Sequence, residues 1–462
     1  MPAAAGCQRL ACEVLRGGVT GRSRPETAPL RLLASLLVAR SSRPAHAIIA
    51  VSIALLAAYF VTWLQLGPVA IGRSDFTAFY AGSTLIREGH GGAAYDAAVQ
   101  GALRDQLIAP DHAGAVPFDD APTAAAVVVP VTLLTLDVAY RVWTLLMLAA
   151  LLAAVVIGVR AAPWPAGISN TWKAAAGAAA LTGTGTWMMF IQGQWGALTA
   201  LGLALAYRDW RAGHQLRGGF LLVVATGIAK PHLALGLAAF VIGWRQRRVI
   251  AGALGGALAL AVTSLVIVGP GGVGNWISGA VSHATRWDLR PMVSFIGIPG
   301  SLLGNGISAH VIAAAASLVA CAAAWWLGSL TRNDSSRLAA AFAGAALMSL
   351  VAAPHAYAQD LVMLAPAFVW IAAWASHDER ASALSTSTRV VAAFTVWGLI
   401  SAFAFVDFLD GAAVPPGQLT AWALVIAASA ACALVWRRGH ASREVTTTAA
   451  PRSEILRASP IR

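Results

Sequence analysis

The sequence Arg73-Ser-Asp-Phe-Thr-Ala-Phe-Tyr-Ala-Gly82 comes shortly after His46–Leu66, the first segment that is long and apolar enough to cross a bilayer. It places a carboxylate, Asp75, within a few residues of a membrane surface. The four-residue spacing of Asp75 and Phe79 predicts a short amphipathic helix that can lie flat at the membrane. Such a helix would hold an acid where it can reach the head group of a lipid-linked molecule.

Asp75 also has a simpler explanation. Asp is common at the start of a helix, where its side chain accepts hydrogen bonds from free backbone N–H groups. Taken alone, the residue favours this interpretation as a solvated N-cap. A reactive role for Asp75 depends on other polar residues of the chain meeting it in space.

The composition predicts an all-α polytopic membrane protein. Of the 462 residues, 58% are hydrophobic and only 11% are charged, and the mean hydropathy is +0.69. A soluble domain carries about 25% charged residues. We expect 11 to 13 transmembrane helices, some of them short or interrupted by Pro and Gly, which is tolerated where a helix borders a cavity.

The formal net charge of +12 does not indicate a nucleic-acid partner. The arginines gather in the two tails and in short loops, as the positive-inside rule predicts for cytoplasmic segments. We therefore divide the chain into a basic, mostly disordered cytoplasmic tail at 1–45, a transmembrane domain at 46–436 and a second basic cytoplasmic tail at 437–462. The four cysteines, Cys7, Cys12, Cys321 and Cys432, have no metal-ligand or paired spacing, so we expect neither a zinc site nor disulfides.

Two long loops are expected on the far side of the membrane, at 67–120 and 269–306. The first contains three basic and seven acidic residues, and an acidic loop in a basic protein belongs outside the cytoplasm. Its apolar residues from Tyr95 onward recur every four positions and predict a second interfacial helix, separated from the Asp75 helix by the glycines at 89–92. Counting crossings from the basic loops places most other polar clusters on the same side as Asp75.

Lys230 lies in Gly227-Ile-Ala-Lys-Pro-His, deep within apolar sequence. A lysine in a membrane segment costs about 2.5–3.5 kcal/mol on insertion scales, so it normally has a partner. A lipid phosphate is a suitable one, and an internal ion pair or a snorkelling side chain are the alternatives. Pro231 should break the helix and help to open a polar pocket.

A second polar cluster follows Pro354. His355, Tyr357 and Asp360 lie between two apolar segments, and a protonated His355 could assist Lys230 in holding an anionic leaving group. Each of these residues could instead be a satisfied polar group at a helix end. The remaining candidates for substrate binding are Tyr80, Gln192, Gln194, His232 and Arg286.

In their order along the chain, five loose motifs resemble glycosyltransferase family 87. They are Asp75-Phe-x-x-Phe-Tyr with the downstream Tyr95-Asp96, a Pro-bracketed apolar segment ending near Trp143, Gln192-Gly-Gln194, Ala229-Lys230-Pro231, and Ala353-Pro354-His355 through Asp360-Leu-Val.

The resemblance, over roughly residues 50 to 435, implies a GT-C fold and an activity. The family includes bacterial mannosyltransferases that use polyprenyl-phosphate mannose, and arabinosyltransferase relatives. It implies an inverting, metal-independent transfer without cofactor, from a polyprenyl-phosphate sugar to a glycolipid or glycan acceptor, on the non-cytoplasmic face of the bacterial plasma (inner) membrane. The family's acid maps to Asp75 and its late histidine to His355, which we take as the catalytic candidates.

One carboxylate suits this chemistry. A glycosidase needs a second acid to protonate a poor leaving group. Phosphate leaves without protonation, so a base for the acceptor hydroxyl and cations for the phosphate suffice. The absence of a GxGxxG or Walker A sequence agrees with a donor that arrives dissolved in the membrane.

Two other classes of protein remain open at this point. A transporter or lipid flippase also uses polar residues in broken helices, but it predicts internal inverted repeats, which the sequence does not show. A non-catalytic scaffold would not explain polar groups buried in the membrane at an energetic cost.

Overall fold

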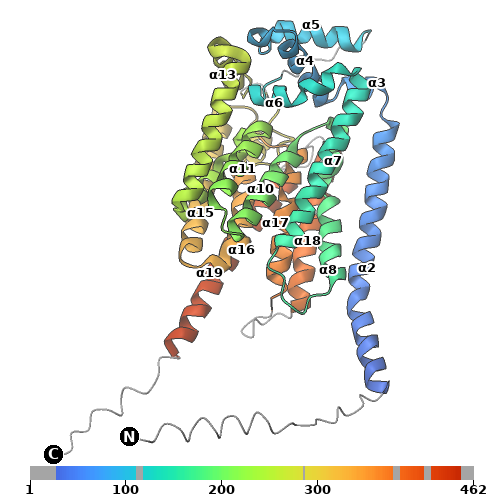
Figure 1. The fold of residues 1–462 in the computed structure, drawn as a ribbon, viewed down its shortest axis with the longest axis vertical. Coiled ribbons are helices and arrows are strands. Elements are labelled where there is room, and N and C mark those ends of the chain that lie inside the picture. Colours follow the sequence, from blue (N-terminus) through green and yellow to red (C-terminus); the bar gives the residue numbers. More distant parts are fainter. Residues whose placement is uncertain (1–27, 111–117, 285–286, 378–385, 410–417, 449–462) are drawn as a thin grey trace, which may run out of the picture. The chain divides into compact units, whose positions relative to one another are not determined.

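The computed structural model describes residues 28–110, 118–284, 287–377, 386–409 and 418–448. Within these ranges the chain forms helices and no strand, which confirms the predicted all-α fold (Figure 1). In chain order the helices are α2 (Ala28–Gln65), α3 (Pro68–Gly72), α4 (Asp75–Arg87), η1 (Gly91–Ala93), α5 (Ala97–Ile108), α6 (Pro122–Val128), η2 (Val129–Leu133), α7 (Leu136–Ala161), α8 (Asn170–Leu181), α9 (Thr184–Gln192), α10 (Gly196–Arg211), α11 (Gln215–Ala229), η3 (Pro231–Ala234), α12 (Leu235–Trp244), α13 (Arg247–Ala284), α14 (Gly297–Leu303), α15 (Ile307–Asn333), η4 (Ser335–Arg337), α16 (Leu338–Ala352), η5 (Ala358–Leu364), α17 (Ala365–Ala375), α18 (Thr386–Leu409) and α19 (Leu419–Thr448).

The protein is a multi-pass membrane protein. Among the described residues, eight helical segments are long and apolar enough to cross a membrane. Three shorter apolar helices lie at Pro122–Leu133, Gln215–Ala229 and Pro231–Trp244. The predicted 11 to 13 spans counted short apolar segments of this kind as well. Hydropathy identifies a segment as apolar, but it does not determine where the helix of that segment begins and ends.

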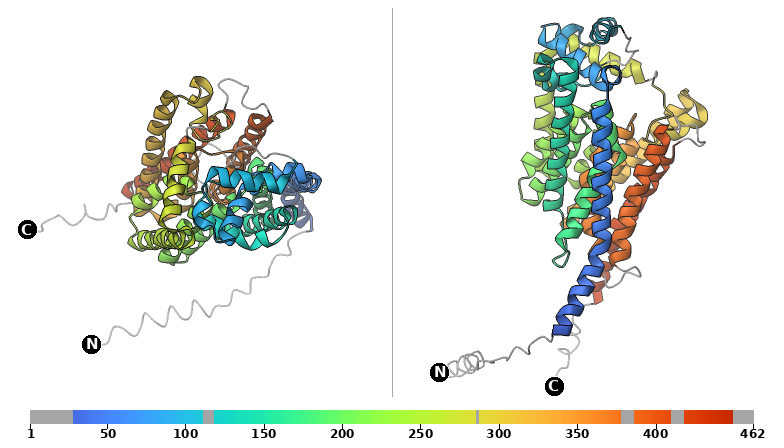
Figure 2. Two further views of the ribbon diagram at one scale, coloured as in Figure 1. Left: turned by 90° about the horizontal axis from the view of Figure 1, so that it is seen from above. Right: turned by 90° about the vertical axis from the view of Figure 1, so that its right-hand side faces the viewer.

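The first long loop contains the two helices that the sequence predicts. α4 carries Asp75 and α5 carries the apolar stripe. Asp96 caps α5 by accepting hydrogen bonds from the backbone N–H groups of Ala98 (2.9 Å) and Val99 (3.1 Å). In Figures 1 and 2, α5 lies crosswise to the long helices α7 and α13. α4 packs against both α5 and α6, so the loop forms a helical layer over one end of these long helices.

The second long loop is a correction. The sequence predicts a loop at 269–306. The structure continues α13 to Ala284 through a kink at Gly269, whose φ is +69°. Glycine allows this angle, and Pro270 fits the first turn of the helix that follows. α14 occupies part of the rest, so the loop is largely helical.

Helices extend into both tails within the part of the chain that the structure describes. α2 begins at Ala28, inside the predicted tail 1–45, and residues 1–27 lie outside the described residues. α19 continues to Thr448, inside the predicted tail 437–462. The chain divides into two compact units, Met1–Ala47 and Ile48–Arg462, and the site described below belongs entirely to the second.

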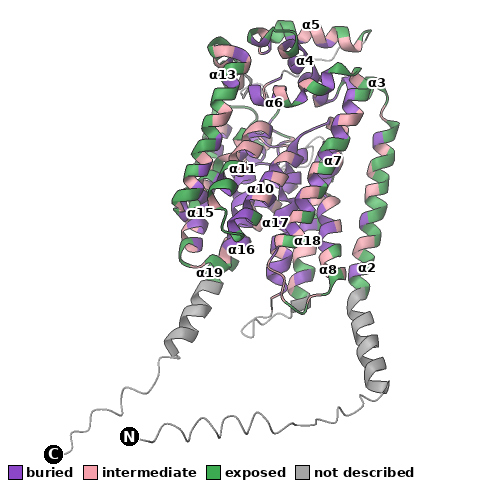
Figure 3. Cartoon of the chain, in the orientation of Figure 1, coloured by how far each residue is buried: buried purple, intermediate pink, exposed green. Residues whose placement is uncertain are grey.

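Close backbone packing positions the polar segments of the second unit. α16 and α17 are almost entirely buried, whereas α13 exposes most of its residues (Figure 3). A Cβ atom at Gly185 of α9 would lie 2.6 Å from the backbone nitrogen of Val362, and one at Gly196 of α10 would lie 2.6 Å from the Val362 side chain. Only glycine permits this approach. The turn between α9 and α10 is thereby held against η5, which carries Asp360.

Candidate functional site

A cavity of about 930 Å³ collects most of the predicted polar residues. Its size falls in the range of small-molecule sites, roughly 300–1,000 Å³. It lies within the second unit and is formed by segments that are far apart in the sequence. The predicted residues that line it are Asp75, Gln192, Gln194, Lys230, His232, His355 and Tyr357.

Asp75 is the first residue of α4, and its carboxylate is engaged by the turn after α9. Gln194 donates a hydrogen bond from Nε2 to Oδ2 of Asp75 at 2.5 Å. The backbone N–H of Asp75 lies 3.4 Å from Oε1 of Gln192. The N-cap position is occupied by Ser74. The carboxylate of Asp75 therefore lies at the cavity wall with a side-chain donor of its own.

The Gln192-Gly-Gln194 turn has a strict geometry. Gly193 ends α9 in the left-handed conformation, with φ +65°, and a Cβ atom there would lie 2.7 Å from Cβ of Phe76. Trp143 donates from Nε1 to the carbonyl of Gly193 at 2.8 Å. Glycine is the residue that tolerates both the angle and the contact. The turn thus presents Gln192 and Gln194 on either side of a fixed point next to α4.

Lys230 lies in the predicted helix break. α11 ends at Ala229, Lys230 has an extended backbone, and Pro231 begins η3, which confirms the break. Nζ of Lys230 is 3.4 Å from Oδ1 of Asp360, and Oδ2 of Asp360 accepts a hydrogen bond from the backbone N–H of Tyr357 at 2.9 Å. Lys230 therefore forms an internal ion pair, which was one of the alternatives to a phosphate partner. It also lines the cavity.

His355 is packed between aromatic rings. Its ring centroid is 3.8 Å from that of His232 and 3.9 Å from that of Trp287. Burial, assisted by the charge of Lys230, lowers the pKa of His355 to about 3. In the protein without ligand His355 is neutral at pH 7. The suggestion that a protonated His355 assists Lys230 therefore needs an arriving anion to raise this pKa.

Two other candidates are not among the residues that line the cavity, and a third is outside the part of the chain that the structure describes. Tyr80 does not line the cavity, because its hydroxyl donates to the carbonyl of Leu134 at 2.8 Å. Asp360 is fully buried and does not line the cavity, but it pairs with Lys230, which does. Arg286 lies outside the described residues.

Two acids that we did not select also line the cavity, Asp119 and Asp120. The indole N–H of Trp276 donates to the carbonyl of Asp119 at 2.9 Å, which joins the end of the first loop to α13. Burial raises the pKa of Asp120 to about 7. The sequence showed them only as part of the loop's negative charge. Their position directly before Pro122, where α6 begins, is the signal that could have singled them out.

A third acid at the cavity, Asp407, has a structural role. Its carboxylate accepts hydrogen bonds from the backbone N–H (2.9 Å) and the hydroxyl (2.6 Å) of Thr420 at the start of α19. These contacts satisfy free donors at a helix N-terminus. Asp75, by contrast, follows the N-cap Ser74, and its carboxylate accepts a hydrogen bond from the side chain of Gln194, which can orient it.

The environment of Asp75 favours proton transfer. Burial raises its pKa, and the negative charge of Asp360 acts in the same direction. The hydrogen bond from Gln194 opposes the rise, as do the positive charges of Lys230 and Arg104. A carboxylate with a raised pKa is a stronger base than an ordinary aspartate, and the ideal base has a pKa near the working pH. The arrangement can accept a proton from a hydroxyl and hold an anion in one enclosure.

The fold and cavity define a class, a polytopic all-α membrane protein whose distant polar residues converge on one cavity. The sequence matches glycosyltransferase family 87 over residues 121–354, just over half of the chain. The protein belongs to this family and is a membrane glycosyltransferase, which confirms the resemblance. Comparison with curated proteins and with solved structures found no match.

The matched segment contains part of the site. Gln192, Gln194 and Lys230 lie within it, His355 is the residue directly after its end, and Asp75 precedes it. Asp75 lines the same cavity as residues of the matched segment, although it precedes that segment in the sequence. The transporter and scaffold alternatives are less suited to this chain, because the family consists of glycosyltransferases.

Proposed function

We propose that the protein transfers a sugar, mannose being the first candidate, from a polyprenyl-phosphate donor to a hydroxyl of a glycolipid or glycan acceptor. The proposal includes a GT-C fold, inversion at the anomeric carbon and no metal or cofactor. One observation carries it: Asp75 and Lys230, although far apart in the sequence, line the same cavity. A base for the acceptor and a cation for the leaving phosphate are the two groups that this reaction needs.

The reaction assigns a role to each wall of the cavity. Asp75 accepts the proton of the acceptor hydroxyl as its oxygen attacks the anomeric carbon from the face opposite the phosphate. The bond from that carbon to the phosphate oxygen breaks, and the phosphate leaves with the electron pair. It gains a second negative charge, which Lys230 stabilises. Gln194 orients the carboxylate of Asp75, to which it is hydrogen-bonded in the structure.

The neutral imidazoles of His232 and His355 fit the same scheme. The two imidazole rings line the cavity in contact with each other, and Lys230 lines the same cavity. A leaving phosphate with two negative charges raises the pKa of a neighbouring imidazole. His355 is neutral before the reaction and can take up a proton as negative charge develops on the leaving phosphate.

The location is part of the proposal. The basic loops support a site on the non-cytoplasmic face of the bacterial plasma (inner) membrane with both termini in the cytoplasm. A lipid-linked donor suits a site formed by loops next to membrane helices, since the donor can remain in the bilayer while its head group reacts.

A transfer assay tests the proposal. Purified protein in vesicles, incubated with polyprenyl-phosphate [14C]mannose and a mixture of glycolipid acceptors, is expected to produce a labelled glycolipid with inverted anomeric configuration. Polyprenyl-phosphate arabinose serves as the second donor and a nucleotide sugar as the control. Transfer from the nucleotide sugar alone, or movement of the donor across the vesicle membrane without transfer, would overturn the proposed reaction.

The pH dependence of transfer should follow Asp75. The base acts when it is deprotonated, so kcat/KM is expected to fall as the pH drops through the raised pKa of Asp75, above the ordinary value of about 3.9. Gln194→Leu removes a hydrogen bond that lowers this pKa, so the acidic limb should move to higher pH. Gln192→Leu is the control, since Gln192 contacts the backbone N–H of Asp75 and not its carboxylate. An acidic limb that stays in place in Gln194→Leu would remove Asp75 as its source.

A further inference from the structure

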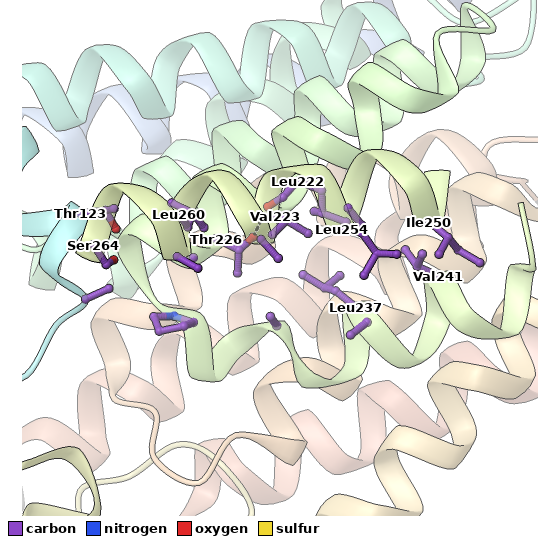
Figure 4. Close-up of a pocket in the computed structure, with 18 of the residues that line it drawn as sticks. Thr123, Leu222, Val223, Thr226, Leu237, Val241, Ile250, Leu254, Leu260 and Ser264 are labelled. Atoms are coloured by element: carbon purple, nitrogen blue, oxygen red, sulfur yellow. Dashed lines mark hydrogen bonds between the residues drawn. The ribbon is translucent and has the colours of Figure 1, made fainter. Parts of the chain in front are cut away.

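A second cavity, of about 610 Å³, runs along helices α11, α12 and α13. Figure 4 shows Ile250 and Val241 toward one end of it and Thr123 and Ser264 toward the other. Its lining is almost entirely aliphatic, and the hydroxyl of Thr226 is satisfied by the carbonyl of Leu222 in its own helix at 2.7 Å. The other two hydroxyls of the lining, Thr123 and Ser264, lie toward one end. This cavity, the α11–α13 groove, is otherwise apolar and suits a hydrocarbon chain.

The helices that form the groove are fixed by close backbone contacts outside it. α11 and α13 touch through glycine: a Cβ atom at Gly219 would lie 2.2 Å from the carbonyl oxygen of Val249. α12 is held in the same way on its other side, where a Cβ atom at Gly243 would lie 2.0 Å from the carbonyl oxygen of Trp325 in α15. The faces of α12 and α13 that line the groove are not packed together. Leu254 and Ile242 are about half exposed or more, at 66% and 58%, and leave the groove open along its side.

The groove adjoins the cavity that holds Asp75 and Lys230. Pro231 and Trp276 line both. Pro231 directly follows Lys230, and Trp276 lies beyond the kink at Gly269, where α13 continues past the groove. If a lipid phosphate binds at Lys230, the apolar groove begins beside it, at Pro231.

The dimensions favour a long chain. From Ile250 to Leu265, α13 rises by about 22 Å at 1.5 Å per residue. The hydrocarbon core of a bilayer is about 30 Å thick, so the groove is longer than half of that thickness. A short acyl chain would fill only part of it.

We propose that the α11–α13 groove binds the polyprenyl chain of the donor, with the phosphate at Lys230, and sets a minimum chain length for efficient transfer. The proposal rests on the proposed function, since it names where the donor's lipid lies. The acceptor's acyl chain and ordinary bilayer lipid are the other possible occupants, and the experiments below separate them.

Two substitutions narrow the groove without disturbing the core. Ala257 of α13 and Ala238 of α12 line it from facing helices and are exposed. Ala257→Phe and Ala238→Phe should each lower kcat/KM for a donor of about ten isoprene units by at least about tenfold, since less of the chain can be buried. Transfer from a donor of about two units, too short to pass the substitution, should be unchanged. Ala251→Phe is the matched control, because Ala251 is an exposed residue of α13 that does not line the groove.

Equal losses with long and short donors, or the same loss in Ala251→Phe, would overturn the proposal. A higher KM for the acceptor, with an unchanged KM for the donor, would assign the groove to the acceptor and also overturn it.

A binding measurement separates this inference from the proposed reaction. A polyprenyl phosphate without sugar, carrying a photoreactive diazirine on its chain, is expected to label α11, α12 and α13 in the Asp75→Asn protein. The label should fall in Ala257→Phe, and excess unlabelled polyprenyl phosphate should displace it. Labelling that does not depend on the groove, or displacement by ordinary phospholipid alone, would show bilayer lipid and sink the assignment. Specific labelling of the groove, together with no sugar transfer by the wild-type protein, would leave the groove assigned and the proposed function wrong.

Discussion

Replacing Asp75 with Asn is expected to lower the kcat of sugar transfer by about 100- to 10,000-fold, the usual contribution of one general base. Asn has the shape of Asp but cannot accept the acceptor's proton. Its side-chain oxygen can still receive the hydrogen bond from Gln194, so α4 and the turn after α9 should keep their positions. The KM for the donor should therefore change little. Initial rates with a labelled donor, measured over a range of donor concentrations, separate the two constants.

Glu88→Gln is the matched control for this substitution. Glu88 is an exposed acid at the other end of α4 and pairs with Arg87 at 2.9 Å. Removing such a surface pair changes stability by about 0.2–1 kcal/mol and should leave the rate unaltered. If the Asp75→Asn protein retained most of the wild-type kcat, another group would have to be the base. Asp120 would then be the first to examine, since it lines the same cavity with a pKa raised to about 7.

The all-α membrane fold could be predicted because composition alone decides it. With 11% charged residues, most of the chain has to lie in lipid, where helices satisfy every backbone hydrogen bond within the segment. The ends of the helices could not be predicted in the same way. A loop is predicted from residue 269, yet α13 continues after a kink at Gly269. One glycine with a positive φ changes the direction of the helix without ending it. Such a choice depends on tertiary contacts.

Part of the site could be predicted from the cost of burying charge. Lys230 is conspicuous in apolar sequence, and counting crossings from the basic loops placed it on the same side as Asp75 before any contact was known. Asp119 and Asp120 gave no such signal, since acids in an acidic loop are ordinary. Their position at the cavity follows from α6 and from the contact with Trp276, which only the folded chain brings near.

The ion pair between Lys230 and Asp360 determines how Lys230 can be tested. Both residues are buried, and breaking a buried pair by removing one partner costs about 3–5 kcal/mol. Lys230→Met alone would leave the carboxylate of Asp360 without its cation. A loss of activity in that variant would not distinguish a missing phosphate ligand from a damaged fold. Replacing both charges at once avoids the unpaired group.

We therefore expect Lys230→Met/Asp360→Asn to keep an apparent Tm near that of the wild type and to lose donor use. An Asn at 360 can still accept the hydrogen bond from Tyr357. A hydrogen bond to a charged group is worth about 1.5–3 kcal/mol, so kcat/KM for the donor should fall by roughly 10- to 150-fold. Asp360→Asn alone leaves Lys230 without its anion, so its apparent Tm should fall, but it retains the cation and should not weaken donor binding. Thermal unfolding in detergent and titration with polyprenyl phosphate measure the two quantities separately. Wild-type donor use in the double variant would show that Lys230 serves only to neutralise Asp360, and the phosphate would have to lie against other groups of the cavity.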